Sequence, residues 1–113
     1  MNIGSDCNKV AFPNLASYAA SEGGMGQFTK VAAAELGEHG ITVNCVAAGA
    51  ILIERTARDA EDYSGEWARL TAIGRVGYPN DVAEAVGFIC TDAAELISGQ
   101  TLMVDGGILT TGP

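Results

Sequence analysis

The stretch "SYAASEGGMGQFTKVAAAELGEHGITVNCV", residues 17–46, decides the fold. Its first two thirds predict a helix over residues 15–38, because apolar side chains recur every three to four residues. These side chains belong to Met25, Phe28, Ala32 and Leu36. His39 and Gly40 give an end signal for that helix. The alternating, β-branched run Ile41–Val46 then predicts a strand, so the stretch is a helix feeding a strand.

The sequence on either side extends this alternation of strands and helices. Residues 1–5 resemble the end of a strand, and residues 54–75 are irregular, with room for one or two short helices. Residues 78–92, "YPNDVAEAVGFICTD", predict a helix that starts at Pro79-Asn80-Asp81, and residues 99–107, "GQTLMVDGG", predict a turn, a strand and a glycine turn. This order favours an α/β fold, a single domain over residues 1–113 with a three-stranded parallel sheet and flanking helices.

Composition narrows the classes of partner and the compartment. The chain has a net charge of -8 with only six Lys and Arg, which argues against nucleic acid or an anionic membrane surface as a partner. Its longest nearly uncharged stretch, Ile41–Ile53, is too short and too polar to span a bilayer, and no secretory leader opens the chain. A cytoplasmic location is therefore expected.

Cysteine and acidic residues offer few metal ligands. The three cysteines show no CxxC spacing, which argues against a zinc site, and Cys45 and Cys90 are expected to be small core residues. An acidic group in the irregular segment comprises Asp59, Glu61, Asp62 and Glu66. Its spacing does not fit a calcium loop, so a solvated loop is favoured and no metal site is predicted.

Three segments together resemble the C-terminal half of short-chain dehydrogenases/reductases. They are residues 2–5, 17–51 and 73–107, and they follow the order and spacing of that family over nearly the whole chain. In the family a Ser stands thirteen residues before the Tyr of a YxxxK motif, and Ser5 and Tyr18 keep that separation. The resemblance implies a truncated Rossmann-like domain that lacks the N-terminal nucleotide-binding half and is completed by oligomerisation.

The resemblance also implies the chemistry of hydride transfer between NAD(P) and a carbonyl or alcohol carbon. In the family the Tyr is the general acid or base, the Ser holds the carbonyl oxygen, and the Lys favours the phenolate and binds the nicotinamide ribose. The Lys position here is Glu22, and a carboxylate there disfavours a phenolate. Ser5, Tyr18 and Glu22 are therefore the candidate catalytic residues, in a site whose family mechanism is disarmed.

The candidate cofactor-binding residues that the resemblance implies follow the strand after this helix. They are Ala48, Gly49 and Ile51, where Ala48-Gly49 replaces the family's Pro-Gly, and Ile53 stands where the family has a Thr. The family's glycine-rich phosphate turn has no counterpart here, because the glycines at positions 23–26 lie inside the predicted helix. NAD(P) is thus the implied cofactor, and the isolated chain is not expected to bind it.

Three functions stay open at this stage. The first is a truncated relative of an NAD(P)-dependent carbonyl reductase with a small-molecule substrate, inactive alone. The second is a repurposed serine hydrolase of esterase or amidase type, with Ser5 as nucleophile and Tyr18 or Glu22 as proton acceptor. The third is a non-catalytic oligomeric binding protein, in which Glu22 is a solvated charge, the interpretation favoured for that residue.

The remaining expectations concern association between copies of the chain and the residues that could cover a substrate. The predicted edge at Asn2 and Ile3 and the apolar helix face around Phe28 predict a homodimer or higher oligomer, and the resemblance implies that this helix packs on its copy. Tyr63 and Trp67 fall in the segment that covers substrate in the family, and a simple packing role is equally open.

Overall fold

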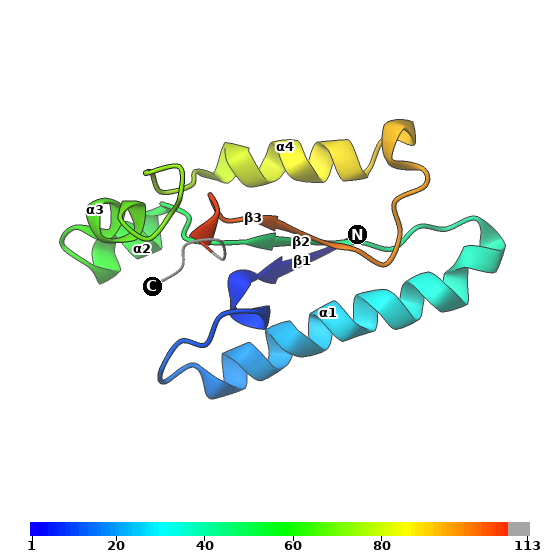
Figure 1. The fold of residues 1–113 in the computed structure, drawn as a ribbon, viewed down its shortest axis with the longest axis horizontal. Helices are drawn as coiled ribbons and strands as arrows, with labels where there is room; N and C mark the ends of the chain where they lie inside the picture. The colour runs from blue at the N-terminus through cyan, green and yellow to red at the C-terminus, as the bar shows by residue number, and fades with distance from the viewer. Residues whose placement is uncertain (109–113) are drawn as a thin grey trace.

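The protein is a three-layer sandwich with the sheet between helices, as the computed structural model of residues 1–108 shows. Helix α4 lies on one face of the sheet and α1 on the other (Figure 1). In chain order the helices and strands are β1 Asn2–Ser5, α1 Ala16–Leu36, β2 Cys45–Ala48, α2 Glu54–Asp59, α3 Tyr63–Ala68, α4 Pro79–Ile89 and β3 Thr101–Val104. Three short 3₁₀ helices lie between them, η1 Asp6–Asn8, η2 Gly37–His39 and η3 Asp92–Ala94. The predicted α/β class is confirmed.

The sheet is parallel, with the strand order β1-β2-β3. The central strand β2 pairs on both sides, so that Ala48 lies opposite Ser5 on one strand and Val104 on the other. Residues 45–47 of β2 are fully buried and form the middle of the core. Since all three strands run in the same direction, their carboxyl ends meet at one edge of the molecule.

Helix α1 runs without interruption through its three glycines. The predicted helix is confirmed, and the glycines do not break it. A Cβ added at Gly23 or Gly24 would meet nothing within 4 Å, whereas Gly26 faces the Asn8 side chain. The buried Thr29 hydroxyl accepts a hydrogen bond from the Asn2 side chain at 3.0 Å and so joins α1 to β1.

Strand β2 begins later than the sequence predicts. The predicted strand is present, but residues 41–44 are outside it and the ladder starts at Cys45, so its predicted start is wrong. The physical reason is that side chains take part in the hydrogen bonds that join this segment to residues 97–100. The Val43 N–H donates to the Ser98 hydroxyl, and the Asn44 side chain donates to the Ile97 carbonyl and accepts from the Gln100 N–H.

Helix α4 confirms the prediction for residues 78–92 at its start. The Asp81 carboxylate accepts the Tyr78 N–H at 2.8 Å and forms a two-pronged ion pair with Arg75, which lowers the pKa of Asp81 to about 2. At the other end the prediction for Cys90 is wrong. Cys90 is exposed because the helix ends at Ile89, whereas Cys45 is buried as expected.

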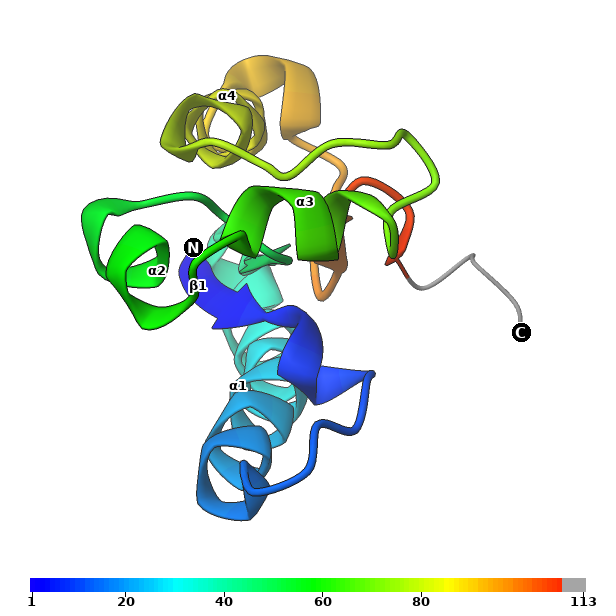
Figure 2. The same cartoon turned by 90° about the vertical axis from the view of Figure 1, so that its left-hand side faces the viewer.

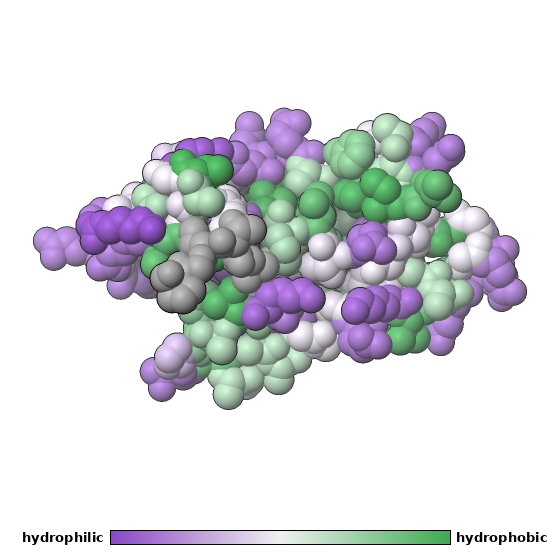
Figure 3. Space-filling model, in the orientation of Figure 1, coloured by the Kyte–Doolittle hydropathy of each residue, from purple (hydrophilic) through white to green (hydrophobic). Residues whose placement is uncertain are grey.

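The irregular segment holds two short helices, as expected. Helices α2 and α3 lie beyond the carboxyl ends of the strands, and α3 faces the viewer in front of that end (Figure 2). Apolar side chains gather on one face over the second half of α4 and over the loop leading into α1 (Figure 3). Among them Phe88 and Leu15 are 48% and 40% exposed. No helix in residues 1–108 is long and apolar enough to cross a bilayer.

Candidate functional site

The candidate site lies where the parallel strands end. Strand β1 leads into η1 at Asp6, β2 leads into Gly49, and β3 leads into the Asp105-Gly106-Gly107 turn. In open α/β sheets ligands bind in the crevice at the carboxyl ends of the strands. Helices α2 and α3 lie over this end of the sheet. The loops after the three strands therefore lie where that rule locates a ligand site.

Ser5 is the last residue of β1 and caps η1. Its hydroxyl oxygen accepts the Cys7 N–H at 3.2 Å, and the hydroxyl donates to Asp6 Oδ1 at 3.1 Å. Both hydrogen bonds are local, as expected for a Ser at a cap position. The hydroxyl that the family resemblance assigns to a substrate carbonyl is therefore already engaged with its own turn.

Tyr18 sits in the first turn of α1 with a side chain 45% exposed. Within residues 1–108 its phenol has no hydrogen-bond partner, and its carbonyl accepts the Ser21 hydroxyl. The structure thus leaves the phenol available to a ligand.

Glu22 lies one helical turn after Tyr18, and its side chain turns toward the sheet. Its Oε2 is buried and has no hydrogen-bond partner among the described residues. A Cβ on Gly4 would lie 3.3 Å from this oxygen and 2.9 Å from the Cys45 sulfur. The interpretation of Glu22 as a solvated charge is wrong, because the absent side chain of Gly4 leaves room for the carboxylate over β1.

The pKa of the Cys45 thiol reflects the same position of Glu22. Burial raises the pKa of Cys45, and the nearby Glu22 charge raises it further. This places a negative charge beside the sheet, at the position where the resemblance expects a cation.

The three candidate cofactor residues follow β2. Ala48 ends the strand, and Gly49 donates its N–H to the Val104 carbonyl at 3.0 Å. A side chain at Gly49 would lie 2.7 Å from the Asp105 backbone, so only glycine permits this close approach. Ile51 pairs with Gly77 in an isolated bridge. These residues are thus held mainly by strand β3 and by the segment before α4.

A pocket of about 160 Å³ opens beside Ser5, and sequence reasoning did not assemble it. Three aromatic rings line it, from Phe12, Tyr63 and Trp67, together with the carboxyl group of Asp6. The remaining lining residues are Cys7, Leu15, Gly49 and Ala50. The Trp67 ring centroid lies 5.7 Å from that of Phe12 at an interplanar angle of 65° and 6.0 Å from that of Tyr63 at 47°. The rings are therefore tilted against one another along the wall of an open pocket and do not stack flat.

Asp6 is the buried polar group of this pocket, at 5% exposure. Burial is the main cause that raises the pKa of Asp6, and the charge of Asp105 adds to it, against the lowering effect of the Ser5 hydrogen bond. Burial also raises the pKa of Tyr63, with a further contribution from the Asp6 charge. In the sequence the family resemblance singled out Tyr63 and Trp67, and nothing in the pattern joined them to Asp6, more than fifty positions away.

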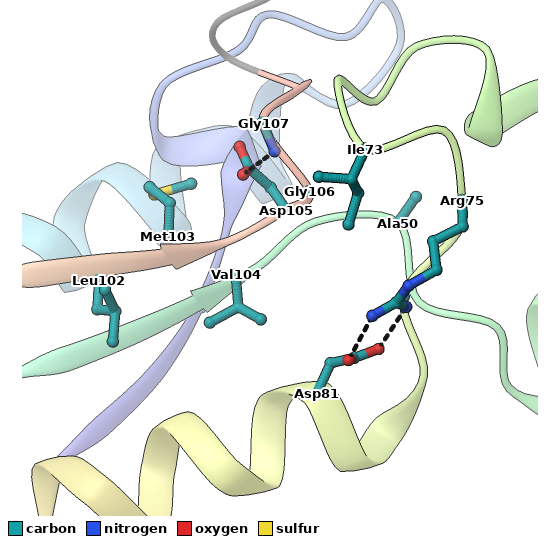
Figure 4. Close-up of a pocket in the computed structure, with 11 residues that line it drawn as sticks. Ala50, Ile73, Arg75, Asp81, Leu102, Met103, Val104, Asp105, Gly106 and Gly107 are labelled. Carbon is teal, nitrogen blue, oxygen red and sulfur yellow. Dashed lines mark hydrogen bonds and ion pairs between the residues drawn. The ribbon is translucent and has the colours of Figure 1, made fainter.

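A larger cavity of about 330 Å³ lies on the other side of the strand ends, between β3 and the start of α4 (Figure 4). Leu102, Val104 and Ile73 supply apolar wall, and the paired Arg75 and Asp81 supply the charged end. Neither Ser5, Tyr18 nor Glu22 lines it. Ser5 is connected instead to the aromatic pocket, because its hydroxyl bonds to Asp6, which lines that pocket.

Known proteins match this chain over almost its whole length. The family model described as enoyl-(acyl carrier protein) reductase matches residues 1–109. The chain is 36% identical over 108 residues to the 3-oxoacyl-[acyl-carrier-protein] reductase FabG of Chlamydia trachomatis, covering 96% of this chain and 44% of that protein. It is 39% identical over 113 residues to 3beta-hydroxysteroid dehydrogenase 1 of Eggerthella lenta, covering 96% of this chain and 42% of the relative.

Solved structures give the same answer for the fold. The acetoin dehydrogenase YohF of Salmonella typhimurium matches with a TM-score of 0.85 and 35% identity, over 99% of this chain and 44% of that one. A gluconate 5-dehydrogenase of Burkholderia cenocepacia, solved with NADP and tartrate, matches with a TM-score of 0.90 and 33% identity, over 98% and 44%. The chain spans less than half the length of these relatives, and it belongs to the short-chain dehydrogenase/reductase family.

Proposed function

We propose that this chain carries the substrate-side part of a short-chain dehydrogenase/reductase site and does not transfer hydride as an isolated chain. The observation that carries the proposal is the Glu22 carboxylate, buried against Gly4 and Cys45 one turn from Tyr18. Tyrosine acts as an acid or base most readily when a neighbouring cation stabilises its phenolate. Here Glu22 takes the place of that cation, with its Oε2 buried and unpaired among the described residues.

The described residues do not fit a whole dinucleotide. A pyrophosphate is held by backbone N–H groups at a helix N-terminus, and the glycines at 23, 24 and 26 lie within α1. Helix α1 starts at Ala16, and its N-cap residue Leu15, which lines the aromatic pocket, provides no side-chain cap. Ala48, Gly49 and Ile51 are proposed as the remnant of the nicotinamide contacts, and NAD(P) binding would need further polypeptide.

The test is calorimetric titration of the purified chain with NADH and NADPH. We expect no saturable binding at millimolar cofactor and no carbonyl reduction. Two variants refine the cause, Glu22→Lys, which supplies a cation, and Glu22→Gln, which is the neutral control. Micromolar binding together with turnover by the unaltered chain would overturn the proposal, whereas binding by Glu22→Lys alone would identify the carboxylate as the block.

The hydrolase alternative has one observation in its favour. The Ser5 hydroxyl donates to Asp6 Oδ1, so a carboxylate stands where it could take the proton of a Ser nucleophile. This role for Asp6 replaces that of Tyr18 or Glu22 in the sequence-based hypothesis. Hydrolysis of short chromogenic esters that Ser5→Ala abolishes would support it, and equal rates for the two proteins would remove it.

The proposed assembly is a homodimer through α1. Its support is a row of exposed apolar side chains on that helix, with Phe28 59% and Val31 46% exposed. Exposed apolar faces of this kind favour association. A cytoplasmic location and a small-molecule substrate remain part of this proposal.

A further inference from the structure

The aromatic pocket combines two features that usually occur apart. Three rings from two separate segments line it, Phe12 from the loop before α1 and Tyr63 and Trp67 from α3. A carboxyl group from η1, that of Asp6, completes the lining. The faces of aromatic rings carry a negative quadrupole, so both kinds of wall attract positive charge.

Among the described residues no cationic side chain lines this pocket, and the charge of Arg55 reaches only Tyr63 among its rings. No Lys, Arg or His is among its lining residues, and within residues 1–108 no ion pair reaches Asp6. Three of the four arginines are instead paired with other carboxylates, and Asp105 adds a second negative charge near Asp6. A buried carboxyl group without a counter-ion is costly, and a cationic ligand would offset that cost.

The form of the cation follows from the hydrogen-bonding groups available. A primary ammonium needs three acceptors, whereas the pocket offers one carboxylate, of which Oδ1 already accepts the Ser5 hydroxyl. A methylated ammonium needs no acceptors and is held by ring faces and a nearby negative charge. The volume of about 160 Å³ suits a compact group of this kind.

We infer that this pocket binds small organic cations of the trimethylammonium type, with Phe12, Tyr63 and Trp67 enclosing the methyl groups and Asp6 supplying the counter-charge. The inference rests on the proposed function in one respect, that this pocket is the substrate side of the site. It deepens that function by assigning a class of ligand. Binding itself requires neither nicotinamide cofactor nor catalysis.

The experiment compares choline with its carbon isostere, in which a tert-butyl group replaces the trimethylammonium group. The two probes have nearly the same shape and differ in charge. Trp67 is the only tryptophan of the chain, so its fluorescence reports occupation of the pocket directly, and calorimetry gives the affinity. We expect saturable binding of choline, with the neutral isostere weaker by about tenfold or more.

Variants assign the binding to the named residues. Asp6→Asn keeps the shape of the side chain and should weaken choline binding about tenfold, leaving the isostere unaffected. Trp67→Leu, followed by calorimetry, should weaken both probes. Phe88→Leu is the matched control, because Phe88 is an exposed aromatic residue on α4 that does not line this pocket, and it should bind as the unaltered chain does.

Three outcomes would overturn the inference. They are no saturable binding of choline, equal affinity for choline and the isostere, or unaltered choline binding by Asp6→Asn. Circular dichroism checks that each variant is folded, and the comparison of the two probes on the unaltered chain needs no variant. A negative result leaves the proposed function standing, since that function is tested with NADH and NADPH.

Discussion

Asp6 makes opposite contributions to stability and to ligand binding. Its raised pKa in the folded chain, caused chiefly by burial, means that folding favours the neutral carboxyl group. A raised folded pKa adds stability below the unfolded value of 3.8, and this stability is lost as the pH rises through the folded value. The Asp6→Asn variant should therefore be more stable than the unaltered chain near neutral pH and about equally stable in acid. Urea unfolding at a series of pH values measures this difference, and a variant less stable at neutral pH would contradict it.

The same group sets the pH dependence of choline binding. Ser5 and Cys7 form hydrogen bonds with Asp6, and the charge of Asp105, just after β3, raises the pKa of Asp6. The charge of Asp6 in turn raises the pKa of Tyr63, and the charge of Arg55 lowers it. Choline does not titrate in this range, so a change in affinity reports the protein. We expect choline affinity to fall as the pH drops through the raised pKa of Asp6, and the affinity of the carbon isostere to stay constant.

Gly49 tests the close packing of the strand ends. The position of an added Cβ lies 2.7 Å from backbone and side-chain carbons of Asp105, which cannot move without shifting β3. Gly49→Ala should destabilise the fold by about 1–3 kcal/mol, the range for overpacking. Thermal unfolding measures the loss, and a melting temperature equal to that of the unaltered chain would show that the turn can adapt.

In helix α1 the same change from glycine to alanine should have the opposite effect on stability. Gly24 lies in the helix interior, and a Cβ there meets nothing within 4 Å. Gly24→Ala should stabilise the fold by about 0.5–1 kcal/mol, because alanine loses less backbone freedom than glycine. A gain in the urea midpoint is the expected result, measured beside Gly49→Ala as the glycine with no room. A loss at position 24 would mean that a partner packs there in solution.

The elements show where sequence reasoning succeeds. Helices α1 and α4 were predictable, because apolar periodicity and the Pro79–Asp81 start signal are local properties of the chain. The start of strand β2 was misplaced because side chains join the segment before it to residues more than fifty positions away. The Ser98 hydroxyl accepts the Val43 N–H, and the Asn44 side chain bonds to the backbone of Ile97 and Gln100. The burial of Glu22 depends on the missing side chain of Gly4 on another element, which no local pattern reveals.

In the candidate site too, some residues could be predicted from the sequence and others could not. The spacing of Ser5 and Tyr18 and the change at Glu22 could be read from the sequence through the family motif. The aromatic pocket could not, because it joins η1, the loop before α1 and α3 through contacts between Phe12 and Trp67 that are distant in sequence. Sequence reasoning named Tyr63 and Trp67 without locating the carboxyl group they face.

At the scale of the whole molecule the main prediction is association through α1. Phe28→Glu places a charge on the exposed apolar face and should convert a dimer into a monomer, as measured by size-exclusion chromatography with light scattering. Leu96→Glu is the control, since Leu96 is 96% exposed and lies after η3, outside α1. A monomeric unaltered chain, or a dimer unaffected by Phe28→Glu, would contradict the prediction.

The parallel direction of the sheet also limits how copies can join. Two identical chains related by a two-fold axis perpendicular to their strands would bring β1 beside its copy in antiparallel orientation. Extending the parallel order at β1 would instead require head-to-tail addition, which does not close on itself, or a strand from a different sequence. Symmetry therefore allows a closed pair of identical copies either at the α1 face or by antiparallel pairing of the β1 edges, and only a continuation of the parallel order at β1 excludes a closed pair.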